Sequence, residues 1–405
     1  MKHRRENILV YIKAHNVVSV DALAALFSIS SRTVRNDLAY LASFGLIKRV
    51  HGGAAFVHHA LLTQLTRDDK NGIGQIIRNV KRPCAAPENK QHSGKVCILG
   101  TFFVDIITKV DHLPTHGEEL LLASDISFGP GGKGANQALA ASAAGAWVHF
   151  VAKVGTDQFS QMAHDHLVSS GINSFTLYQT PEASTGCSVI YVSQEHGESI
   201  IAISPGANKK ITDLEIAAMY QELSAADIFL LHTGNNISAV TSAIKLANLL
   251  NVMVILNPAP ITEEIKSCLP MVNIIIPNVI AATRLSGIEV QDLDSAKLAA
   301  KVIHALGVNT VIITMGGFGA LLYFDSSFYH FPAYTSVQID TTGAGDAFCG
   351  AFSAMMAKGE NILYCINYAS AFASLVVEKE GAANMPSGEE INYRLKRRTS
   401  HYELV

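Results

Sequence analysis

Residues 340–348 read Asp-Thr-Thr-Gly-Ala-Gly-Asp-Ala-Phe and lead into a stretch with helical character. Glycines directly before a helix leave backbone N–H groups free to surround an anion, and the positive end of the helix dipole strengthens that attraction. Asp346 opens the helix and can take a proton from an alcohol. A glycine turn followed by an Asp N-cap is the plainer interpretation, but the whole nine-residue setting favours an anion site with a base beside it.

A second glycine-rich stretch precedes another helical segment. Residues 129–138 read Gly-Pro-Gly-Gly-Lys-Gly-Ala-Asn-Gln-Ala. Glycine lets the backbone approach a ligand closely, and Lys133 and Asn136 offer donors to hydroxyl groups. A simple turn into a helix would leave the same pattern.

Two further features suit a ligand site at one edge of a sheet. Residues 314–319, Thr-Met-Gly-Gly-Phe-Gly, follow an apolar strand directly, where open α/β sheets bind nucleotides. A strand-to-hairpin turn would explain them equally well. Asp105 comes soon after the strand expected at 95–100 and can accept hydrogen bonds from two sugar hydroxyls, although an isolated Asp there is often a turn former.

The C-terminal three quarters of the chain alternate between strand and helix patterns. Helical patterns at 135–144 and 298–306 separate several apolar runs, which predicts a mostly parallel sheet with helices on both faces, an α/β fold. Residues 119–126 and the alternating run at 187–203 break the pattern, and we expect them to form a small antiparallel lid. The strands are expected at residues 95–100, 147–151, 228–231, 252–256, 273–276 and 310–314.

Composition excludes several classes of protein. The chain of 405 residues is 49% hydrophobic and 16% charged, which argues against overall disorder. It holds no apolar run of about 18 residues, so no membrane span is expected. The 6 cysteines are scattered without a Cys-x-x-Cys pair, which suggests neither a zinc site nor a disulfide framework. A reducing cytoplasm fits best.

Charge divides the chain into two unlike parts. Residues 1–95 hold 15 Lys and Arg against 6 Asp and Glu, a net charge of +9, whereas the remainder carries a net charge of −12. A basic head suggests contact with a polyanion, although a solvated face with a basic linker would give the same balance. We divide the chain into residues 1–58, a linker at 59–94 that can include a short helix at 75–80, and residues 95–405.

The head has the pattern of a winged helix-turn-helix. Helical spacing at residues 4–15, a second short helix after Ser19 and a third from Ser30 or Ser31 are followed by a hairpin at 48–54. The third helix of such a domain enters the major groove, where Arg and Thr reach base edges and phosphates. A helical protein–protein module is the alternative. The candidate DNA contacts are Arg32, Thr33, Arg35, Lys48, Arg49 and His51.

Both parts resemble known families. The Ser-x-x-Thr-Val-Arg-Asn-Asp-Leu helix and the Arg-Val-His-Gly-Gly-Ala wing resemble the DNA-binding head of the DeoR family of bacterial sugar-responsive regulators. From about Lys95 to Pro386 the chain resembles the ribokinase-like (PfkB) carbohydrate kinases, whose two signature regions are the glycine stretches at 129–138 and 340–348. Residues 184–186, 205–208 and 256–260 resemble ribokinase in particular.

The kinase resemblance implies roles for particular residues. Asp346 would be the general base, and Gly343, Ala344 and Gly345 would form the anion hole for the γ-phosphate of ATP. The sugar or nucleoside would be held by Asp105, Gly131, Gly132, Lys133, Asn136 and Glu198. The ATP side would include Asn278, Thr314, Gly316, Gly319 and Gly345. A monovalent cation, K⁺, would be bound by Asp340 and Thr342 and by carbonyl groups near Val376, Lys379 and Gly381. Mg²⁺ would arrive with ATP, bound mainly through phosphates and water.

The sequence departs from the family pattern at two places. The family usually has Asn-x-x-Glu after the strand near Ile276, and here the Glu position is Ala281. Losing that carboxylate should weaken the handling of metal and phosphate. Ribokinase has Asn two residues before the sugar-binding Asp, and here that residue is Phe103. An apolar ring there argues against plain ribose and suits a deoxysugar or a nucleoside.

Two functions from different classes follow from these features. The first is an ATP-dependent kinase for a pentose, deoxypentose or nucleoside, fused to a head that binds double-stranded DNA and regulates transcription. The second is a sugar-sensing regulator whose kinase fold is catalytically weak or inactive, which Ala281 and Phe103 favour and Asp346 opposes. A kinase with a head that no longer binds DNA is a third possibility. Such heads work in pairs and such kinases commonly dimerise through the lid, so a homodimer is expected.

Overall fold

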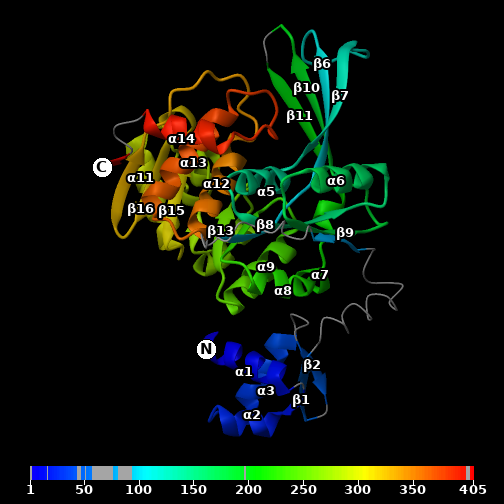
Figure 1. Cartoon of the computed structure of the whole chain (residues 1–405), viewed down its shortest axis with the longest axis vertical. Coiled ribbons are helices and arrows are strands. Elements are labelled where there is room, and N and C mark those ends of the chain that lie inside the picture. Colours follow the sequence, from blue (N-terminus) through cyan, green and yellow to red (C-terminus); the bar gives the residue numbers. More distant parts are fainter. Residues whose placement is uncertain are drawn as a thin grey trace.

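The computed structural model of the chain describes residues 2–15, 17–42, 47–50, 52–56, 76–80, 94–195, 198–397 and 402–405. It consists of a small N-terminal head and a large α/β domain with a protruding sheet (Figure 1). The expected fold class is confirmed, with a winged helix-turn-helix preceding a mostly parallel sheet covered by helices on both faces.

The head combines three helices with a three-stranded sheet. Its helices are α1 (Lys2–His15), α2 (Val20–Leu26) and α3 (Ser31–Ala42), and its strands are β1 (Val17–Ser19), β2 (Ile47–Val50) and β3 (Gly53–Phe56), in the order β1-β3-β2. The side chain of Ser19 caps α2, and Ser30 Oγ accepts the backbone N–H of Thr33 at the start of α3. Val34, Leu38 and Leu41 are buried at helical spacing, so the opposite face of α3 is left to polar residues.

The large domain is built on a long sheet with a parallel centre. Eleven strands of the described chain run in the order β18-β17-β16-β15-β14-β13-β12-β5-β8-β9-β4, and those from β15 to β9 are parallel. Buried apolar runs form the central strands, as expected for a sheet covered on both faces. The strands are β4 (Ile76–Val80), β5 (Lys95–Leu99), β8 (Trp147–Val154), β9 (Ser174–Gln179), β12 (Ile228–His232), β13 (Met253–Asn257), β14 (Ile274–Ile275), β15 (Thr310–Thr314), β16 (Ala320–Phe324), β17 (Ser327–Phe331) and β18 (Glu403–Leu404).

Helices cover the two faces and bury two separate apolar clusters. Cys97 and Leu99 of β5 belong to one cluster and Val96 and Ile98 to the other, because alternate side chains of a strand point to opposite faces. The first face carries α7 (Asp213–Ala218), α8 (Tyr220–Ser224), α9 (Ile237–Leu249), α10 (Val279–Ser286) and α11 (Leu293–Ala305). The second carries α5 (Lys133–Ala143), α6 (Gln158–Ser169), α12 (Ala344–Ala357), α13 (Ile362–Val376) and α14 (Gly388–Lys396).

A four-stranded sheet projects from the domain, in the order β11-β10-β6-β7 (Figure 1). It contains β7 (Ala123–Gly131), β10 (Cys187–Ser193) and β11 (Ser199–Ser204), close to the expected lid segments, and also β6 (Phe103–Val110), which was not expected there. The lid is mixed and not antiparallel as expected, because β6 and β10 pair parallel. Because β6 follows β5 after only three residues, the lid is anchored directly at the end of a central strand.

The expected helix at 75–80 is wrong. Residues 76–80 form the strand β4 (Ile76–Val80), which pairs antiparallel with β9 and extends the large sheet at that edge. Backbone pairing with an open edge strand outweighs local helical propensity here. No helix in the described ranges is long and apolar enough to cross a membrane.

Candidate functional site

The two glycine signatures meet at the point where the strand order reverses. β5 lies between β12 and β8, and connections leave the sheet in opposite directions there, which is where open α/β sheets bind ligands. The first turns of α5 and α12 lie at this edge, since the helices pack against each other and both contact β5 and β12. Gly350 of α12 lies so close to the backbone of Gln137 that a Cβ would overlap it.

Asp346 is buried at the start of α12, with 6% of its surface exposed. Gln137 Nε2 donates to Asp346 Oδ1 over 3.1 Å, and the ammonium of Lys133 lies 4.0 Å from Oδ2. Burial raises the pKa of Asp346 above its ordinary value, although Lys133 and the side chains of Gln137 and Asn136 oppose the shift. A buried carboxylate with a raised pKa that is held by donors suits a general base.

The backbone before Asp346 has the conformation that an anion hole requires. Gly343 has φ of +78°, a left-handed conformation that favours glycine, and it immediately precedes α12. The first-turn N–H groups of a helix have no partner within the helix, and a Cβ on Gly345 would meet nothing within 4 Å. Ala344 and Gly345 line the large pocket described below. The N–H of Ala344 donates to the carbonyl of Thr341 at 3.3 Å, a long hydrogen bond. Open space lies beside Gly345, next to the carboxylate of Asp346.

The sugar-side residues lie at the start of α5 and the base of the lid. Asp105 of β6 accepts a hydrogen bond from Ser188 of β10, and a Cβ on Gly131 would overlap its carboxylate. Burial raises the pKa of Asp105, and the Ser188 hydrogen bond opposes the shift. Gly131 and Lys133 are two residues apart, one beside Asp105 and the other beside Asp346. The structure thus brings Asp105, Gly131, Gly132, Lys133, Asn136 and Asp346 to one end of α5.

Glu198 lies away from these sugar-side residues. It is exposed at the β10–β11 hairpin, where its carbonyl accepts the N–H of Ser193. Ser193 is five residues along β10 from Ser188, a distance of roughly 16 Å at the rise of a β-strand. Its expected contact with the same sugar is therefore not supported within one chain.

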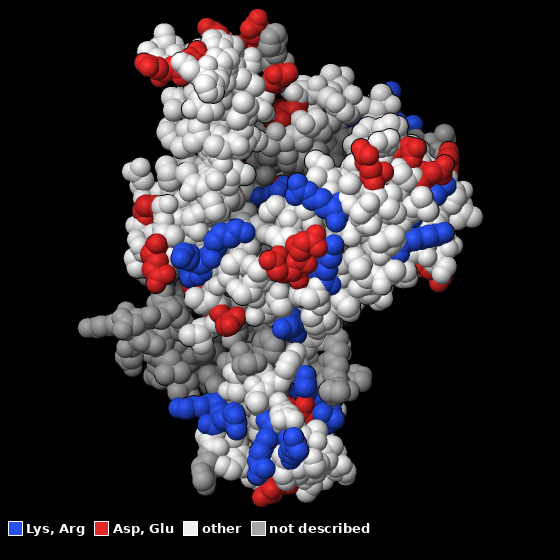
Figure 2. All heavy atoms as spheres, turned by 180° about the vertical axis from the view of Figure 1, so that it is seen from behind, with Lys and Arg blue, Asp and Glu red and all other residues white. Residues whose placement is uncertain are grey.

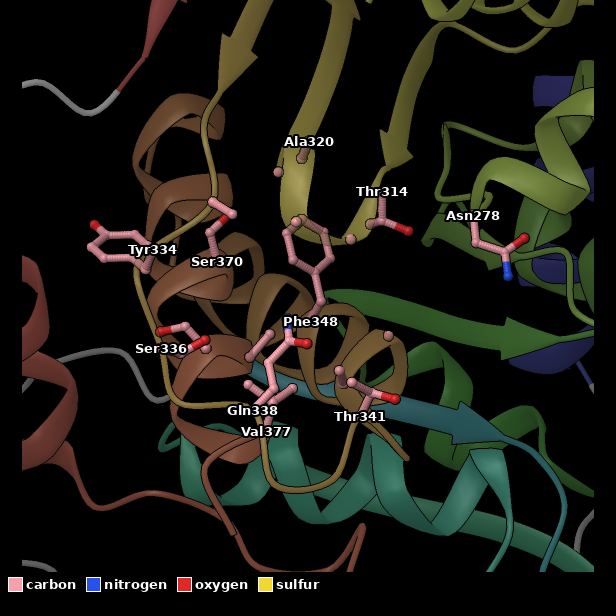
Figure 3. A pocket seen from close by; sticks show the side chains of 18 of the residues that line it. Asn278, Thr314, Ala320, Tyr334, Ser336, Gln338, Thr341, Phe348, Ser370 and Val377 are labelled. Atoms are coloured by element: carbon pink, nitrogen blue, oxygen red, sulfur yellow. The ribbon is translucent and has the colours of Figure 1, made fainter. Parts of the chain in front are cut away.

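A pocket of about 670 Å³ adjoins the anion hole (Figure 3). All the residues expected on the ATP side line it, namely Asn278, Thr314, Gly316, Gly319 and Gly345. Asn278 caps α10 by accepting the N–H of Ala281, which is buried with 4% exposure. The opposite wall was missed by the sequence analysis, because single polar residues there form no motif. It is made by Tyr334, Thr335, Ser336, Gln338, Ser370 and Ser374.

The carboxylate of Asp340 is held in its ionised form by backbone hydrogen bonds, a few residues before Gly343. Its carboxylate accepts the N–H of Thr342 over 2.8 Å and that of Gly381 over 3.0 Å. Burial alone would raise the pKa of Asp340, but these hydrogen bonds outweigh it and hold the pKa below its ordinary value. The carbonyl of Val376 accepts the N–H of Lys379 in the same turn. An ionised carboxylate is an oxygen ligand of the kind that a monovalent cation would use.

No group of three or more His, Cys, Asp or Glu side chains in the described ranges could hold a metal ion. Ala281 supplies no carboxylate beside Asn278. A Mg²⁺ ion that arrives with ATP would be held mainly by phosphates and water.

Three side chains missed by the sequence analysis support the site. Asn257, at the end of β13, faces the amide of Gln137 at 3.4 Å, and Ser188 holds Asp105. His232, at the end of β12, lies against the backbone of Thr101. Burial, with Lys133 nearby, lowers the pKa of His232 to about 3, so the ring is neutral. Of these three, Asn257 lies within a segment that already resembled ribokinase, so the sequence could have indicated its role.

The head presents its cationic residues to solvent. Arg32, Arg35, Lys48 and Arg49 are exposed and Thr33 is half-buried, whereas His51 lies outside the described residues. Figure 2 shows blue side chains gathered over the head, with few red ones among them. Asp37 of α3 is buried instead, and accepts hydrogen bonds from Arg4 and Arg5 of α1, each at 2.8 Å.

Two family models match different parts of the chain. Residues 93–388 match the pfkB family of carbohydrate kinases, and residues 4–60 match the DeoR-like helix-turn-helix domain. The described part of the body thus carries a kinase-type site, and the head carries a DNA-binding type of fold.

Individual relatives cover most of the chain. A ribokinase of Staphylococcus aureus is 34% identical over 302 residues, which are 74% of this chain and 99% of the relative. A deoxyribokinase of Salmonella typhimurium is 32% identical over 299 residues, 73% of this chain and 97% of the relative. The structure of Arabidopsis thaliana ribokinase complexed with ribose and ATP is 27% identical, with a TM-score of 0.68, and the match covers 75% of this chain and 99% of that chain.

Proposed function

The chain belongs to the pfkB family of carbohydrate kinases and is an ATP-dependent sugar kinase with a DeoR-like head, and on that premise we propose that it phosphorylates a pentose, deoxypentose or nucleoside. The observation that carries the proposal is the position of Asp346. Its buried carboxylate lies beside Lys133 and directly after two residues that line the ATP-sized pocket. A hydroxyl oriented by Asp105 and Lys133 would therefore stand between a base and an anion hole.

The proposed reaction uses positioning and charge stabilisation. Asp346 takes the proton of the sugar hydroxyl, whose oxygen forms a bond to the γ-phosphorus while the bond to the ADP oxygen breaks. Backbone N–H groups of residues 343–345 stabilise the charge on the transferred group. Lys133, 4.0 Å from Asp346, stabilises the ionised carboxylate and offers a donor to the substrate. Mg²⁺ bound to ATP would neutralise phosphate charge, and K⁺ beside Asp340 would stabilise the anion-hole loop.

The substrate is proposed to lack a hydroxyl that ribose has. Phe103 and Asp105 lie two residues apart on β6, so their side chains share one face of the strand. The Phe103 ring offers no hydrogen bond to a sugar hydroxyl, and a buried hydroxyl without a partner is costly. Among pentoses this favours a deoxypentose. The similarity to a deoxyribokinase of Salmonella typhimurium supports the same substrate class.

Turnover on a substrate panel tests the proposal. ADP release is measured with Mg-ATP and K⁺ on D-ribose, 2-deoxy-D-ribose, D-fructose and adenosine, with Asp346→Asn as the matched control. We expect turnover on one member, lost in the control while binding of that sugar persists. Sugar-induced thermal stabilisation without any turnover would instead support a sensor with an inactive kinase fold, a function that the missing carboxylate at Ala281 favours.

The head is proposed to bind double-stranded DNA through α3 and the β2–β3 wing. Exposed Arg32 and Arg35 on α3, together with Lys48 and Arg49 on β2, supply contacts to phosphates and base edges. Each phosphate contact contributes roughly one unit to the slope of log affinity against log salt. Arg35→Ala should therefore lower the slope by about one. A slope unchanged by substitution of all four cationic residues would contradict the proposal.

A second copy of the chain is the proposed partner of the lid. β7 and β11 expose apolar side chains that cover no other part of the described chain, including Ile126, Phe128, Ile201 and Ile203, with exposures of 49–63%. A patch of this kind marks an interface. Sedimentation should report a dimer for the wild type and a shift toward monomer for Phe128→Glu. A wild-type monomer at all concentrations would exclude this interface.

A further inference from the structure

Helix α1 of the head contacts helix α9 of the kinase domain. Figure 1 shows the head next to the side of the domain that carries α8 and α9. The buried apolar residues of the head, among them Ile8 and Ile12 of α1, belong to the same contiguous cluster as those of α9. If the linker only joined two domains that do not touch, the head and the kinase domain would each have a separate apolar cluster. The α9 side of the kinase domain therefore serves as a surface for this chain's own head.

On the head side, α1 is attached to the helix proposed to read DNA. Asp37 of α3 is 1% exposed and accepts one hydrogen bond each from Arg4 and Arg5. The guanidinium of Arg5 also lies over the ring of Tyr40, 3.9 Å from its centre. A displacement of α1 would thus be passed to α3 through two ion pairs to the buried Asp37 and a cation–π contact.

On the kinase side, α9 begins beside the sugar site. Phe102, next to Phe103, has both backbone groups bound by Asn208, with its N–H donating to Oδ1 at 3.1 Å and its carbonyl accepting from Nδ2 at 2.9 Å. The amide of Asn235 donates to the carbonyl of Asn208 at 3.1 Å, two residues before α9 starts. A shift of the strand that carries Phe103 and Asp105 would reach α9 through these two side chains.

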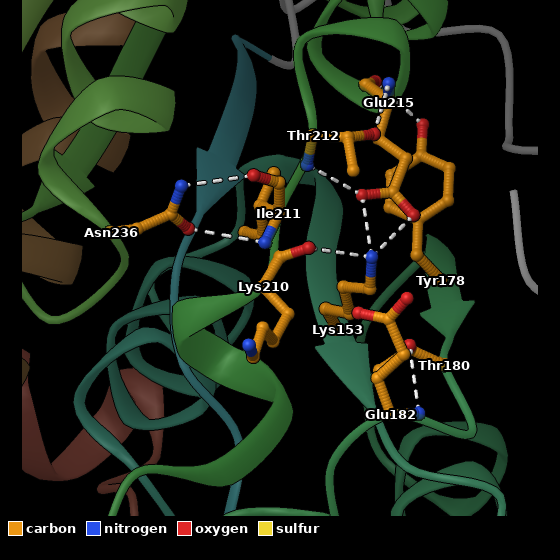
Figure 4. Close-up of polar contacts among 9 residues, drawn as sticks. All are labelled: Lys153, Tyr178, Thr180, Glu182, Lys210, Ile211, Thr212, Glu215 and Asn236. Atoms are coloured by element: carbon orange, nitrogen blue, oxygen red, sulfur yellow. Dashed lines mark hydrogen bonds and ion pairs between the residues drawn. The ribbon is translucent and has the colours of Figure 1, made fainter. Parts of the chain in front are cut away.

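The N-cap of α9 is tied to the same segment (Figure 4). Asn236 Nδ2 donates to the carbonyl of Ile211 at 2.9 Å, and its Oδ1 accepts the N–H of Ile211 at 3.1 Å. The neighbouring carbonyl of Lys210 accepts from Lys153, which is buried against Glu215 at 2.9 Å. Residues 208–211 are therefore bound by Lys153 and also by Asn236 at the start of α9. A movement of this segment would reach α9 through Asn236.

One buried group in this chain of contacts is unsatisfied. Asn235 is 1% exposed, and its Oδ1 has no hydrogen-bond partner among the described residues. A buried acceptor without a donor is costly, so an arrangement that supplies a donor would be favoured. A second conformation of Asn235 that gives its Oδ1 a hydrogen-bond donor would therefore be favoured if the sugar site changes.

We propose that α9 is the docking surface for the DNA-binding head and that occupancy of the sugar site changes this docking through Asn235 and Asn236. The proposal rests on the function proposed above, because the ligand is the sugar of that site. Coupling between sites needs a contiguous set of contacts whose arrangement both sites bias. The set runs from Phe102 through Asn208, Asn235 and α9 to α1 and Asp37.

Amide hydrogen exchange of the full chain tests the proposal. Exchange is compared without ligand and with saturating D-ribose, 2-deoxy-D-ribose or adenosine, each with Mg-ADP. With the sugar that is turned over, we expect exchange in α1 to change by about fivefold or more, the lower range of allosteric coupling. Exchange in α3 should stay constant, which separates altered docking from unfolding of the head.

Asn236→Ala should abolish the response of α1 while turnover is retained, since Asn236 contacts Ile211 and no site residue. Asn248→Ala, near the other end of α9, is the matched control and should keep the response. Turnover without any change in α1 would overturn the coupling and leave the kinase proposal standing. A change in α1 without turnover on any panel member would support coupling and contradict the kinase proposal.

Discussion

The side-chain amide of Gln137 donates to the carboxylate of Asp346 over 3.1 Å, joining the two glycine signatures of the chain, which are 209 residues apart in sequence. Gln137 is fully buried on α5 and also faces Asn257 at the end of β13. Its position makes the protonation of Asp346 depend on a residue that touches no expected substrate atom. Gln137 is therefore a positioning residue whose effect should be visible in the pH dependence of catalysis.

Gln137→Leu should move the acidic limb of the kcat/KM profile to higher pH. Asp346 works as a base only when ionised, so activity is lost as pH falls through its pKa. Burial already raises that pKa, and Gln137 opposes the shift. Removing the donor should raise the pKa further, because one hydrogen bond that favours the ionised form is lost. Gln161→Leu, which changes an exposed amide, is the control, and a parallel loss of rate at every pH would contradict this role.

Phe103→Asn should shift the substrate preference toward ribose. The substitution places an amide on the same strand face as Asp105, where it can bind a sugar hydroxyl. One added hydrogen bond of about 1.4 kcal/mol corresponds to a tenfold change. The ratio of kcat/KM for 2-deoxy-D-ribose to that for D-ribose should therefore fall by about tenfold. Phe103→Leu is the control and should keep the wild-type preference. If Phe103→Asn changes kcat/KM equally for both sugars, the side chain at position 103 does not discriminate between them.

Ala281→Glu should lower the Mg²⁺ concentration required for half-maximal turnover. Ala281 is the third residue of α10, and its N–H is bound by the N-cap Asn278, which lines the nucleotide pocket. A carboxylate there is compatible with the helix dipole and can order water around the metal. Outer-shell partners of metals typically change affinity by about 10-fold or more. Ala281→Gln has the same size without the charge and should leave the Mg²⁺ dependence unchanged; if both variants behave alike, charge at this position is irrelevant.

Local patterns in the sequence predicted the frame of the site. The strands at 95–100 and 310–314 were predictable because buried parallel strands are continuous apolar runs. The glycine stretches marked the starts of α5 and α12, since a ligand-binding helix N-terminus needs an unusual backbone that only a few residues allow. The apolar runs and the glycine stretches each span about ten consecutive residues or fewer, so both can be recognised without knowing the fold.

Features that depend on distant partners were missed. β4 was expected to be helical, but its pairing with β9 decides its conformation. β6 was not expected to be a strand, because most of its side chains are only half-buried in the lid and its pattern is weak. Ser188 acquires its role only through pairing with Asp105 across two strands. The position of Glu198 at the tip of the lid hairpin was missed for the same reason, since strand register sets it.

Asp37→Asn should destabilise the head and make the remaining stability insensitive to acid. Burial alone would raise the pKa of Asp37, but hydrogen bonds from Arg4 and Arg5 outweigh it and hold the pKa below its ordinary value. Its folded pKa is thus lower than its unfolded pKa. The wild-type contribution to stability is therefore complete above the unfolded value of about 4 and is lost as pH falls through the folded pKa.

Amide exchange in α3, measured on the full chain between neutral pH and pH 3, would check this prediction. Two charge-assisted hydrogen bonds from partly exposed arginines suggest a loss of about 1–3 kcal/mol for Asp37→Asn at neutral pH. The wild-type head should lose stability as the pH falls toward 3, whereas the variant should not. Asp21→Asn, at an exposed position of α2, should cost less than about 1 kcal/mol. Equal acid sensitivity in the wild type and Asp37→Asn would show that another carboxylate controls the head, and α1 would then lack the attachment to α3 on which transmission from the kinase domain depends.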